Sequence, residues 1–192
     1  ALGILPKISN INSENIFATT PIAIEDILGR KQKVHNPKFL KNISGKKILV
    51  TGAGGSIGSE ICKQVSLLSP KKLILLDENE YALYNVLQTI NKKAEPILAD
   101  VRDSKKMDKI INDFKPDIVF HAAALKHITF VENDPMEAFK TNFMATMKLC
   151  EICKFYKVPK FIFISTDKAV DPSNIMGATK RLCEKYIQNI SS

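Results

Sequence analysis

Three absences narrow the class of protein before any motif is considered. No apolar stretch approaches the ~20 residues that a membrane-spanning helix needs, and no signal peptide is visible. Lysine and arginine form no dense basic run, and no zinc-finger or basic-helix pattern is present, so we expect no nucleic-acid partner. With 192 residues, 45% hydrophobic and 25% charged, the chain has the composition of one globular domain.

Cysteine is also scarce, with four residues in the whole chain. Cys150 and Cys153 form a CxxC pair, but this pair falls inside a segment with helical periodicity. A redox CxxC needs a helix amino terminus to lower its thiol pKa, and a zinc site needs two more ligands nearby. We therefore expect core or surface thiols in a reducing cytoplasm, and no metal site.

The net charge of +8 leaves more than one interpretation open. A basic chain can bind nucleic acid, an anionic membrane surface or a phosphorylated ligand. Because the lysines are spread along the whole sequence, the simplest interpretation is a solvated, lysine-rich surface. A bias toward a phosphorylated substrate or a membrane face is the alternative.

Residues 1–45 differ in pattern from the rest of the chain. They are rich in Asn, Ser, Pro and Lys, with one short helical candidate at 22–28, and we interpret them as an N-terminal arm or linker. From residue 46 onward, apolar strand patterns alternate with helical patterns. The predicted strands cover 46–51, 71–76, 95–99, 117–120 and 160–165, and the predicted helices cover 56–68, 80–91, 103–114, 135–156 and 175–190.

This alternation predicts the fold class. Strands that are apolar throughout and alternate with helices indicate a parallel sheet covered on both faces. Right-handed crossovers then give a doubly wound α/β sheet, a Rossmann fold, for which the strand order 3-2-1-4-5 is expected. The first residue of the helix at 103–114 should be capped by Asp103 or Ser104.

A glycine-rich turn lies between the first strand and the first helix. The sequence TGAGGSIG gives the spacing GxxGxxG, with glycines at 52, 55 and 58. Gly52 permits a sharp turn, Gly55 lets backbone amides approach a pyrophosphate, and Gly58 lets the helix pack close to the strand. The helix start at Ser56 and Ile57 would offer N–H groups to that anion. Because the cluster follows a strand and opens a helix, it predicts dinucleotide binding.

Acidic residues after the second and third strands favour one dinucleotide. Asp77 ends the second strand, about 20 residues past the glycines, where a carboxylate accepts hydrogen bonds from the adenosine ribose. It would repel a 2′-phosphate, and no arginine stands beside it, so NAD is favoured over NADP. Asp100 and Val101 follow the third strand, where adenine should lie; a helix cap is the alternative for Asp100.

Together with later motifs, these residues resemble the extended short-chain dehydrogenases/reductases. More narrowly, the chain is similar to the membrane-anchored polysaccharide-biosynthesis 4,6-dehydratases that act on UDP-N-acetylglucosamine. The resemblance runs from about residue 46 to 185, in TGAGGSIG (51–58), DVRD (100–103), HAAALKH (121–127), TN (141–142) and STDKAVDPSNIMGATK (165–180). EDILGR at 25–30 also resembles the junction before the catalytic core of the large members.

The resemblance carries expectations about the whole protein. Large members have transmembrane helices and another domain upstream, and they continue into a C-terminal substrate domain. We therefore expect a piece of a longer protein, truncated before the substrate domain and poorly active alone. The resemblance places the parent on the cytoplasmic side of a bacterial inner membrane, anchored in it, and implies a homo-oligomer.

The resemblance also implies a reaction and its residues. With NAD as cofactor, hydride leaves sugar C4, water is eliminated across C5 and C6, and hydride returns to C6, giving a UDP-linked 4-keto-6-deoxy sugar. Elimination needs a base and an acid, and a neighbouring Lys–Asp pair can divide these tasks. The family pattern makes Lys168 the base and Asp167 the acid, which the chemistry alone does not fix.

One position departs from the general family pattern. Met176 stands where the Tyr-x-x-x-Lys pair has its tyrosine, and Lys180 is the lysine, expected at the nicotinamide ribose. A thioether cannot deprotonate a sugar hydroxyl. The large membrane-anchored dehydratases resemble this chain in having methionine there, so the base for C4 stays open. Our hypothesis is Thr166, working through Asp167.

The remaining expected cofactor residues follow the fourth strand, the long helix and the fifth strand. They are Ala122, Ala123, Ala124, Lys126, Asn142 and Ser165. Lys126 could reach a phosphate or a sugar hydroxyl, with a solvated loop lysine as the alternative. For Asn142 the alternative is capping or packing.

Two other functions compete with the dehydratase. A nucleotide-sugar epimerase of the same fold needs no C5 base, so the Asp167-Lys168 pair argues against it. A non-catalytic NAD-binding module is favoured slightly by Met176. The sequence leaves the destination of the product open.

Overall fold

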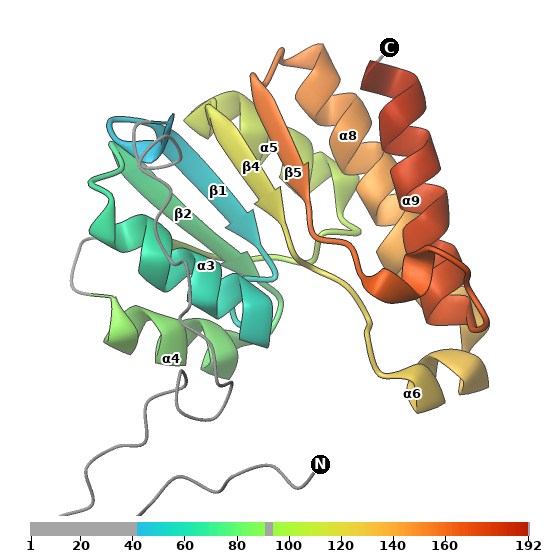
Figure 1. Cartoon of the computed structure of the whole chain (residues 1–192). Coiled ribbons are helices and arrows are strands. Elements are labelled where there is room, and N and C mark those ends of the chain that lie inside the picture. Colours follow the sequence, from blue (N-terminus) through green and yellow to red (C-terminus); the bar gives the residue numbers. More distant parts are fainter. Residues whose placement is uncertain (1–41, 91–93, 192) are drawn as a thin grey trace, which may run out of the picture. The chain divides into compact units, whose positions relative to one another are not determined.

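The computed structural model describes residues 42–90 and 94–191, which are built around a five-stranded parallel sheet (Figure 1). The strands are β1 (Lys47–Thr51), β2 (Lys72–Asp77), β3 (Glu95–Leu98), β4 (Ile118–His121) and β5 (Lys160–Phe163). Their order is β3-β2-β1-β4-β5 and every neighbouring pair is parallel, which confirms the predicted doubly wound sheet. The predicted helix at 22–28 lies outside the described residues.

Helices cover both faces of the sheet because successive side chains of each strand point to opposite faces. The helices that follow the first two strands, α3 (Ser56–Leu67) and α4 (Glu80–Thr89), pack on one face. On the other face lie α5 (Ser104–Phe114) and α8 (Ala145–Phe155), with α9 (Ile175–Ser191) beside α8 (Figure 1). The winding changes direction between β1 and β4, and at such a point ligands bind in this class of sheet.

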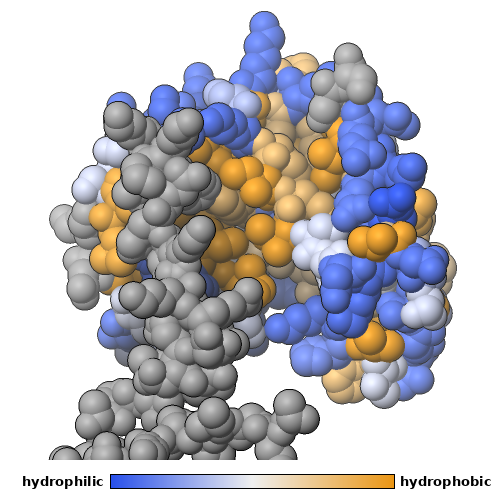
Figure 2. Space-filling view, in the orientation of Figure 1, coloured by the Kyte–Doolittle hydropathy of each residue, from blue (hydrophilic) through white to orange (hydrophobic). Residues whose placement is uncertain are grey.

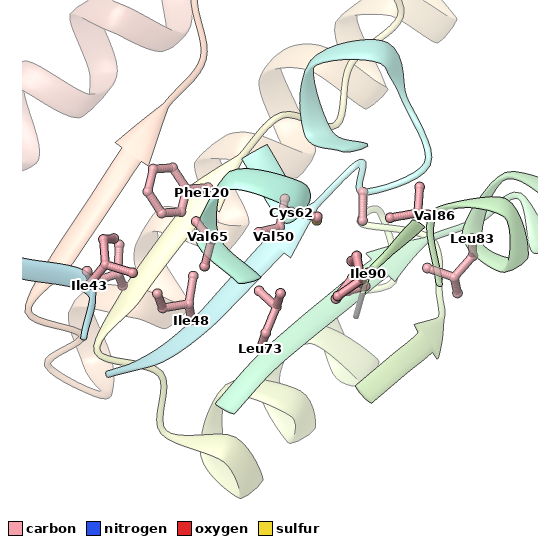
Figure 3. Close-up of a cluster of buried hydrophobic side chains, with 13 residues drawn as sticks. Ile43, Ile48, Val50, Cys62, Val65, Leu73, Leu83, Val86, Ile90 and Phe120 are labelled. Carbon is pink, nitrogen blue, oxygen red and sulfur yellow. The ribbon is translucent and has the colours of Figure 1, made fainter. Parts of the chain in front are cut away.

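The core on the first face shows how the strands hold the helices in place (Figure 3). Ile48 and Val50 of β1 are fully buried and pack with Cys62 and Val65 of α3. Ile43, which precedes β1, is fully buried in the same cluster. The helix that carries the glycine turn is therefore anchored along its length to the central strand.

The helix predicted over 135–156 is confirmed as a continuous helical stretch from Pro135 to Phe155, but its π segment and the short helix before it were not predicted. The chain first forms α6 (Ile128–Asn133), then α7 (Pro135–Ala138), a π-helix (Phe139–Met144) and finally α8. Asp134 caps α7 by accepting a hydrogen bond from Glu137 N (3.2 Å). A six-residue helix is too short to show a periodicity, and a π turn adds one residue without interrupting the apolar pattern.

Smaller features of the described part complete the comparison with the sequence. Asp103 caps α5, as predicted, with Oδ1 accepting from Lys106 N (3.0 Å). All four cysteines are buried and unpaired. Across residues 42–90 and 94–191, no helix has both the length and the apolar character needed to traverse a bilayer.

Candidate functional site

A cleft of about 280 Å³ opens at the carboxyl edge of the sheet, beside the glycine turn. The ends of β2 and β3 and the loop after β4 form its other walls. Among the residues predicted to bind the cofactor, those that line it are Gly52, Gly55, Asp77, Asp100, Val101, Ala122, Ala123 and Ala124. Lining residues that the sequence did not single out are Gly54, Leu76, Glu78, Asn79, Ala82, Ala99, Leu125 and Thr141.

The glycines of the turn are required by close backbone contacts. Gly52 has a positive φ of 67°, and a Cβ there would lie 2.5 Å from Ala123 N. A Cβ on Gly58 would lie 1.9 Å from Gly52 O, so the helix can approach the strand only without a side chain. Gly55 is exposed, and a Cβ there would meet only Gly52 O, at 3.3 Å. The turn is thus packed on its protein side and open toward the cleft.

Gly54 is a site residue that the spacing GxxGxxG did not reveal. A Cβ at this position would lie 2.5 Å from Ala82 Cβ. Its N–H donates to Asp77 Oδ2 (2.8 Å), so the turn and the end of β2 are joined directly. The only signal in the sequence was the doubled glycine, because Gly54 falls between the positions that the motif specifies.

Asp77 is held in a fixed orientation at the wall of the cleft. Oδ2 accepts from Gly54 N, and Oδ1 accepts from Asn79 N (2.9 Å). Each oxygen keeps further acceptor capacity for ribose hydroxyls. Glu78 lines the cleft next to it, so a 2′-phosphate would meet two carboxylates.

The start of α3 is suited to an anion. Its N-cap, Gly55, provides no side-chain hydrogen bond, and the first turn contains no acidic residue. Lys126 Nζ donates to Ser56 Oγ (3.2 Å), which brings an ammonium close to the positive end of the helix dipole. Ser56 and Ile57 are exposed. Because the partner of the Lys126 ammonium is a neutral hydroxyl, its charge is not balanced there, and a bound phosphate could balance it.

Asp100 forms part of an ion-pair chain on the rim of the cleft. Arg102 donates to it through Nε (2.7 Å) and the backbone N (2.8 Å), and through Nη1 to Glu137 Oε2 (2.8 Å). Partial burial raises the pKa of Asp100, but the hydrogen bonds and charge of Arg102 outweigh it and the pKa is lowered. The helix-cap role belongs to Asp103 instead.

The three predicted catalytic residues lie together after β5, where Thr166 caps a short 3-10 turn (Asp167–Ala169). We call residues Thr166–Lys168 the ionic corner. Thr166 Oγ1 donates to Asp167 Oδ1 (2.9 Å), and Lys168 Nζ lies 3.5 Å from the same oxygen. The hydrogen bond from Thr166 and the charge of Lys168 lower the pKa of Asp167, so this exposed group is a carboxylate at neutral pH.

Helix α9 supports the ionic corner through a glycine that the sequence did not single out. A Cβ on Gly177 would lie 2.3 Å from Lys168 O, so only glycine lets α9 begin this close to the corner. Ser165 is attached to the same helix, since its hydroxyl donates to Glu184 Oε1 (2.6 Å). The helical pattern of 175–190 gave no sign that one face of its first turn meets another backbone.

Lys180 and Met176 lie on α9 and do not line the cleft. Lys180 is buried; Nζ donates to Ile164 O (2.9 Å) and lies 4.5 Å from the centre of the Phe163 ring. Burial lowers the pKa of Lys180 to about 8. The side chain of Met176 packs in a small apolar cluster with Val131. Their placement at the nicotinamide stays a prediction.

A buried histidine connects the glycine turn to the helices behind the sheet. His121 Nδ1 lies 2.6 Å from Thr51 Oγ1, and Nε2 lies 2.8 Å from Thr146 Oγ1. Because the Thr146 hydroxyl donates to Asn142 O (2.6 Å), Nε2 must be the donor to Thr146 and Nδ1 the acceptor from Thr51. Burial, and then the charge of Lys180, lower the pKa of His121 to about 3, so the ring is neutral.

Asn142 holds the loop after β4 against α9. Its Oδ1 accepts from Leu125 N (2.8 Å), while Nδ2 donates to Leu125 O (3.0 Å) and Thr179 Oγ1 (3.0 Å). The residue is 1% exposed. These bonds match the packing alternative, and a contact with the cofactor stays a prediction.

Known proteins resemble the chain in both sequence and structure. A family model described as "Polysaccharide biosynthesis protein" matches residues 48–192. The chain is 41% identical over 196 residues to "Capsular polysaccharide biosynthesis protein CapD" of Staphylococcus aureus, covering 97% of this chain and 33% of that protein. It is 35% identical over 144 residues to "UDP-N-acetylglucosamine 4,6-dehydratase (inverting)" of Campylobacter jejuni, covering 74% and 42%.

A solved structure shares the fold. The UDP-glucose 4-epimerase of Bifidobacterium longum, in complex with NAD+ and UDP, gives a TM-score of 0.69 at 24% identity. The match covers 75% of this chain and 48% of that one. The chain spans 33% to 42% of the two sequence relatives named above.

Two glycines with the same backbone conformation test the close contact at the turn. Gly45 and Gly52 both have positive φ, 71° and 67°, but a Cβ on Gly45 would meet nothing within 4 Å. Both alanine variants should lose about 1 kcal/mol of unfolding free energy from backbone strain. Gly52→Ala should lose about 1–3 kcal/mol more and should bind NAD poorly, because Ala123 must move. Denaturant unfolding and calorimetry measure both effects; equal losses would contradict the contact.

Neutral His121 predicts a pH dependence of stability. Its pKa is about 3 in the folded state and about 6.5 when unfolded, so the unfolded state binds the extra proton between these values. Its contribution is complete above pH 6.5 and falls as the pH drops toward 3, by at most about 1.4 kcal/mol per pH unit. His121→Gln should flatten this dependence, whereas replacing the exposed His127 should not; parallel slopes for all three proteins would refute the assignment.

Proposed function

We propose a function from the premise that this chain belongs to the polysaccharide biosynthesis protein family. The coarse proposal is an NAD-dependent enzyme acting on nucleotide sugars, of the short-chain dehydrogenase/reductase type. The finer proposal is a 4,6-dehydratase that converts UDP-N-acetylglucosamine into a UDP-4-keto-6-deoxy sugar. The observation that carries it is the ionic corner beside α9, at the same sheet edge as the cleft.

The cleft supports NAD as the cofactor. When bound, NAD supplies a hydride acceptor that returns the hydride within one turnover. Asp77 offers two oriented oxygens to the ribose hydroxyls, and the start of α3 with Lys126 offers positive charge to the pyrophosphate. Neighbouring carboxylates disfavour the 2′-phosphate of NADP. A solved structure with this fold holds NAD+.

The ionic corner supports the elimination step. Lys168 is proposed to take the C5 proton and Asp167 to protonate the departing C6 hydroxyl. In the free protein Asp167 is an exposed carboxylate with a lowered pKa, so it must gain its proton during the turnover, from the C4 hydroxyl in the oxidation step that precedes elimination. A sugar covering the corner would desolvate the carboxylate and raise its pKa, which is the usual route to a neutral-pH acid.

The oxidation at C4 needs a base other than residue 176. The Met176 thioether is 6% exposed and packs with apolar side chains, so it offers no base. Thr166 is proposed to take the proton of the C4 hydroxyl and pass it to Asp167, whose Oδ1 already accepts the Thr166 hydroxyl hydrogen at 2.9 Å. Lys180 keeps two N–H groups beyond its bond to Ile164 O for the nicotinamide ribose.

The epimerase is the second candidate. It draws support from the shared fold with the UDP-glucose 4-epimerase of Bifidobacterium longum. Epimerisation needs oxidation and reduction at C4 but no base at C5, so the Asp167–Lys168 pair would then have no task. Membrane attachment of the whole protein and a homo-oligomeric state are further proposals that rest on the resemblance alone.

Product analysis separates the candidates. The protein, expressed at its full natural length, is incubated with UDP-N-acetylglucosamine and followed by NMR. The dehydratase should convert the C6 hydroxymethyl signals into a methyl signal. Inversion at C4 with C6 unchanged would establish the epimerase instead. An unchanged sugar in the presence of bound NAD would identify the chain as a non-catalytic NAD-binding module.

Two substitutions assign the steps to residues. Lys168→Met should stop elimination but permit C4 oxidation, so the absorbance of reduced cofactor builds up while C5 exchanges no deuterium with solvent. Thr166→Val should block the C4 oxidation itself, so that no reduced cofactor appears. Each should lower kcat about 10²- to 10⁴-fold, the usual worth of a general acid or base. Lys105→Met, on exposed α5 surface, is the charge-matched control. Full hydride transfer by Thr166→Val would refute its role at C4.

A further inference from the structure

Lysines that are scattered in the sequence gather at one edge of the sheet. Because all five strands are parallel, their amino ends share the edge opposite the cleft. Strands β1, β2 and β5 each begin with a lysine. Lys46 and Lys71 directly precede β1 and β2, and Lys115 and Lys157 lie three residues before β4 and β5. We call this set the lysine edge: Lys46, Lys47, Lys71, Lys72, Lys115, Lys157 and Lys160.

Backbone contacts show that these lysines are neighbours. Lys71 N donates to Lys46 O (2.8 Å), and Lys47 lies in register with Lys72. Lys115 and Lys157 line one recess at the start of β4 and β5. With neighbouring strands ~4.8 Å apart, the row from β2 through β1 and β4 to β5 extends about 15 Å.

The charge of the lysine edge is mostly unbalanced. Lys72 forms an ion pair with Glu95, and Lys47 Nζ donates to Phe114 O (3.1 Å). The other five are exposed, and none forms a salt bridge with any residue of the described ranges. The opposite edge carries the carboxylates of the cleft and the ionic corner. Glu95 and Asp117 lie at the lysine edge as well, but the lysines outnumber them and the edge is net basic. The cleft at the other edge is lined by Asp77, Glu78 and Asp100.

Exposed apolar side chains flank the lysines. Phe155, at the end of α8, is 76% exposed and lines the recess with Lys115 and Lys157. Leu67, at the end of α3 and four residues before Lys71, is 69% exposed. Lysines around protruding apolar groups are typical of surfaces that insert into the headgroup region of a bilayer. The row contains no arginine, the residue that nucleic-acid binders favour for phosphate and base contacts.

We infer that the lysine edge is a docking surface for an anionic phospholipid bilayer. The ammonium groups would lie among the phosphates, and Phe155 and Leu67 would reach the acyl boundary. Figure 2 shows hydrophilic side chains along the upper side of the molecule, where the strands of Figure 1 begin. With this edge on the bilayer, the cleft at the opposite edge faces the aqueous phase. This inference does not depend on the reaction proposed above.

Vesicle binding tests the inference without any activity readout. The 192-residue chain is sedimented with vesicles of phosphatidylcholine, with or without phosphatidylglycerol, at low and physiological salt. We expect binding only to the anionic vesicles, weakening as salt screens the charges. Phe155→Ser should weaken the binding about tenfold.

Matched quadruple variants locate the surface. Four exposed lysines of the edge are changed in one variant: Lys71→Gln, Lys115→Gln, Lys157→Gln and Lys160→Gln. The control removes the same charge from exposed helix positions outside the edge: Lys105→Gln, Lys109→Gln, Lys148→Gln and Lys185→Gln. Because each lysine should contribute about fivefold to the vesicle affinity, the edge variant should bind at least about 100-fold more weakly. The control should bind nearly as tightly as the unsubstituted chain. Melting temperatures verify that both variants are folded.

Three outcomes would overturn the inference. Equal binding to phosphatidylcholine alone would show that charge does not drive the contact. Equal losses in the two quadruple variants would show that net charge, rather than this edge, is responsible. Tighter binding to duplex DNA or RNA than to the anionic vesicles would identify nucleic acid as the partner of the surface.

Discussion

The architecture of the site depends on one close approach, between the turn after β1 and the loop after β4. Gly52 lies so near the backbone of Ala123 that a Cβ would fall 2.5 Å from its nitrogen, and Gly58 packs against the carbonyl of Gly52 in the same way. This contact closes the floor of the cleft and directs the start of α3 toward its opening. A bulkier turn would separate β1 from β4 where the sheet changes its winding direction, and the anion-binding helix start would lose its position.

A chain of buried hydrogen bonds connects the glycine turn to the helices on the other side of the sheet. Thr51, at the end of β1, donates to His121, which donates to Thr146, and the Thr146 hydroxyl donates to the carbonyl of Asn142. Asn142 in turn holds the loop at Leu125 and bonds to α9. Each group has a partner, and no buried side-chain polar atom in the described part is unsatisfied. Such a satisfied chain favours one relative placement of turn, loop and α9 because a shift would leave a buried polar group without a bond.

Local signals explain why much of this was predictable and why some was not. The cap at Asp103 follows from a few neighbouring residues. The sheet order follows from the alternation of strand and helix patterns, and the roles of Gly52 and Gly58 follow from a glycine spacing that is typical of this turn. Gly54 and Gly177 are required by atoms of Ala82 and Lys168, so no pattern around either glycine could reveal them. The π-helix escaped prediction because its extra residue leaves the apolar pattern intact. The direct role of Asn142 at the cofactor remains a prediction.

The same topology that creates the cleft also sorts the charges. In a parallel sheet, every residue that precedes a strand goes to one edge and every residue that follows a strand goes to the other, whatever their separation in the chain. Lys46 and Lys160 are therefore brought to one edge, whereas Asp77 ends β2 and Asp167 follows β5 at the other. The spread of lysines along the sequence predicted a solvated, lysine-rich surface, and the exposure of these side chains agrees with it. The topology adds where those solvated lysines gather, since uniform spacing in sequence becomes a concentrated patch whenever the basic residues occupy equivalent positions of successive β-α units.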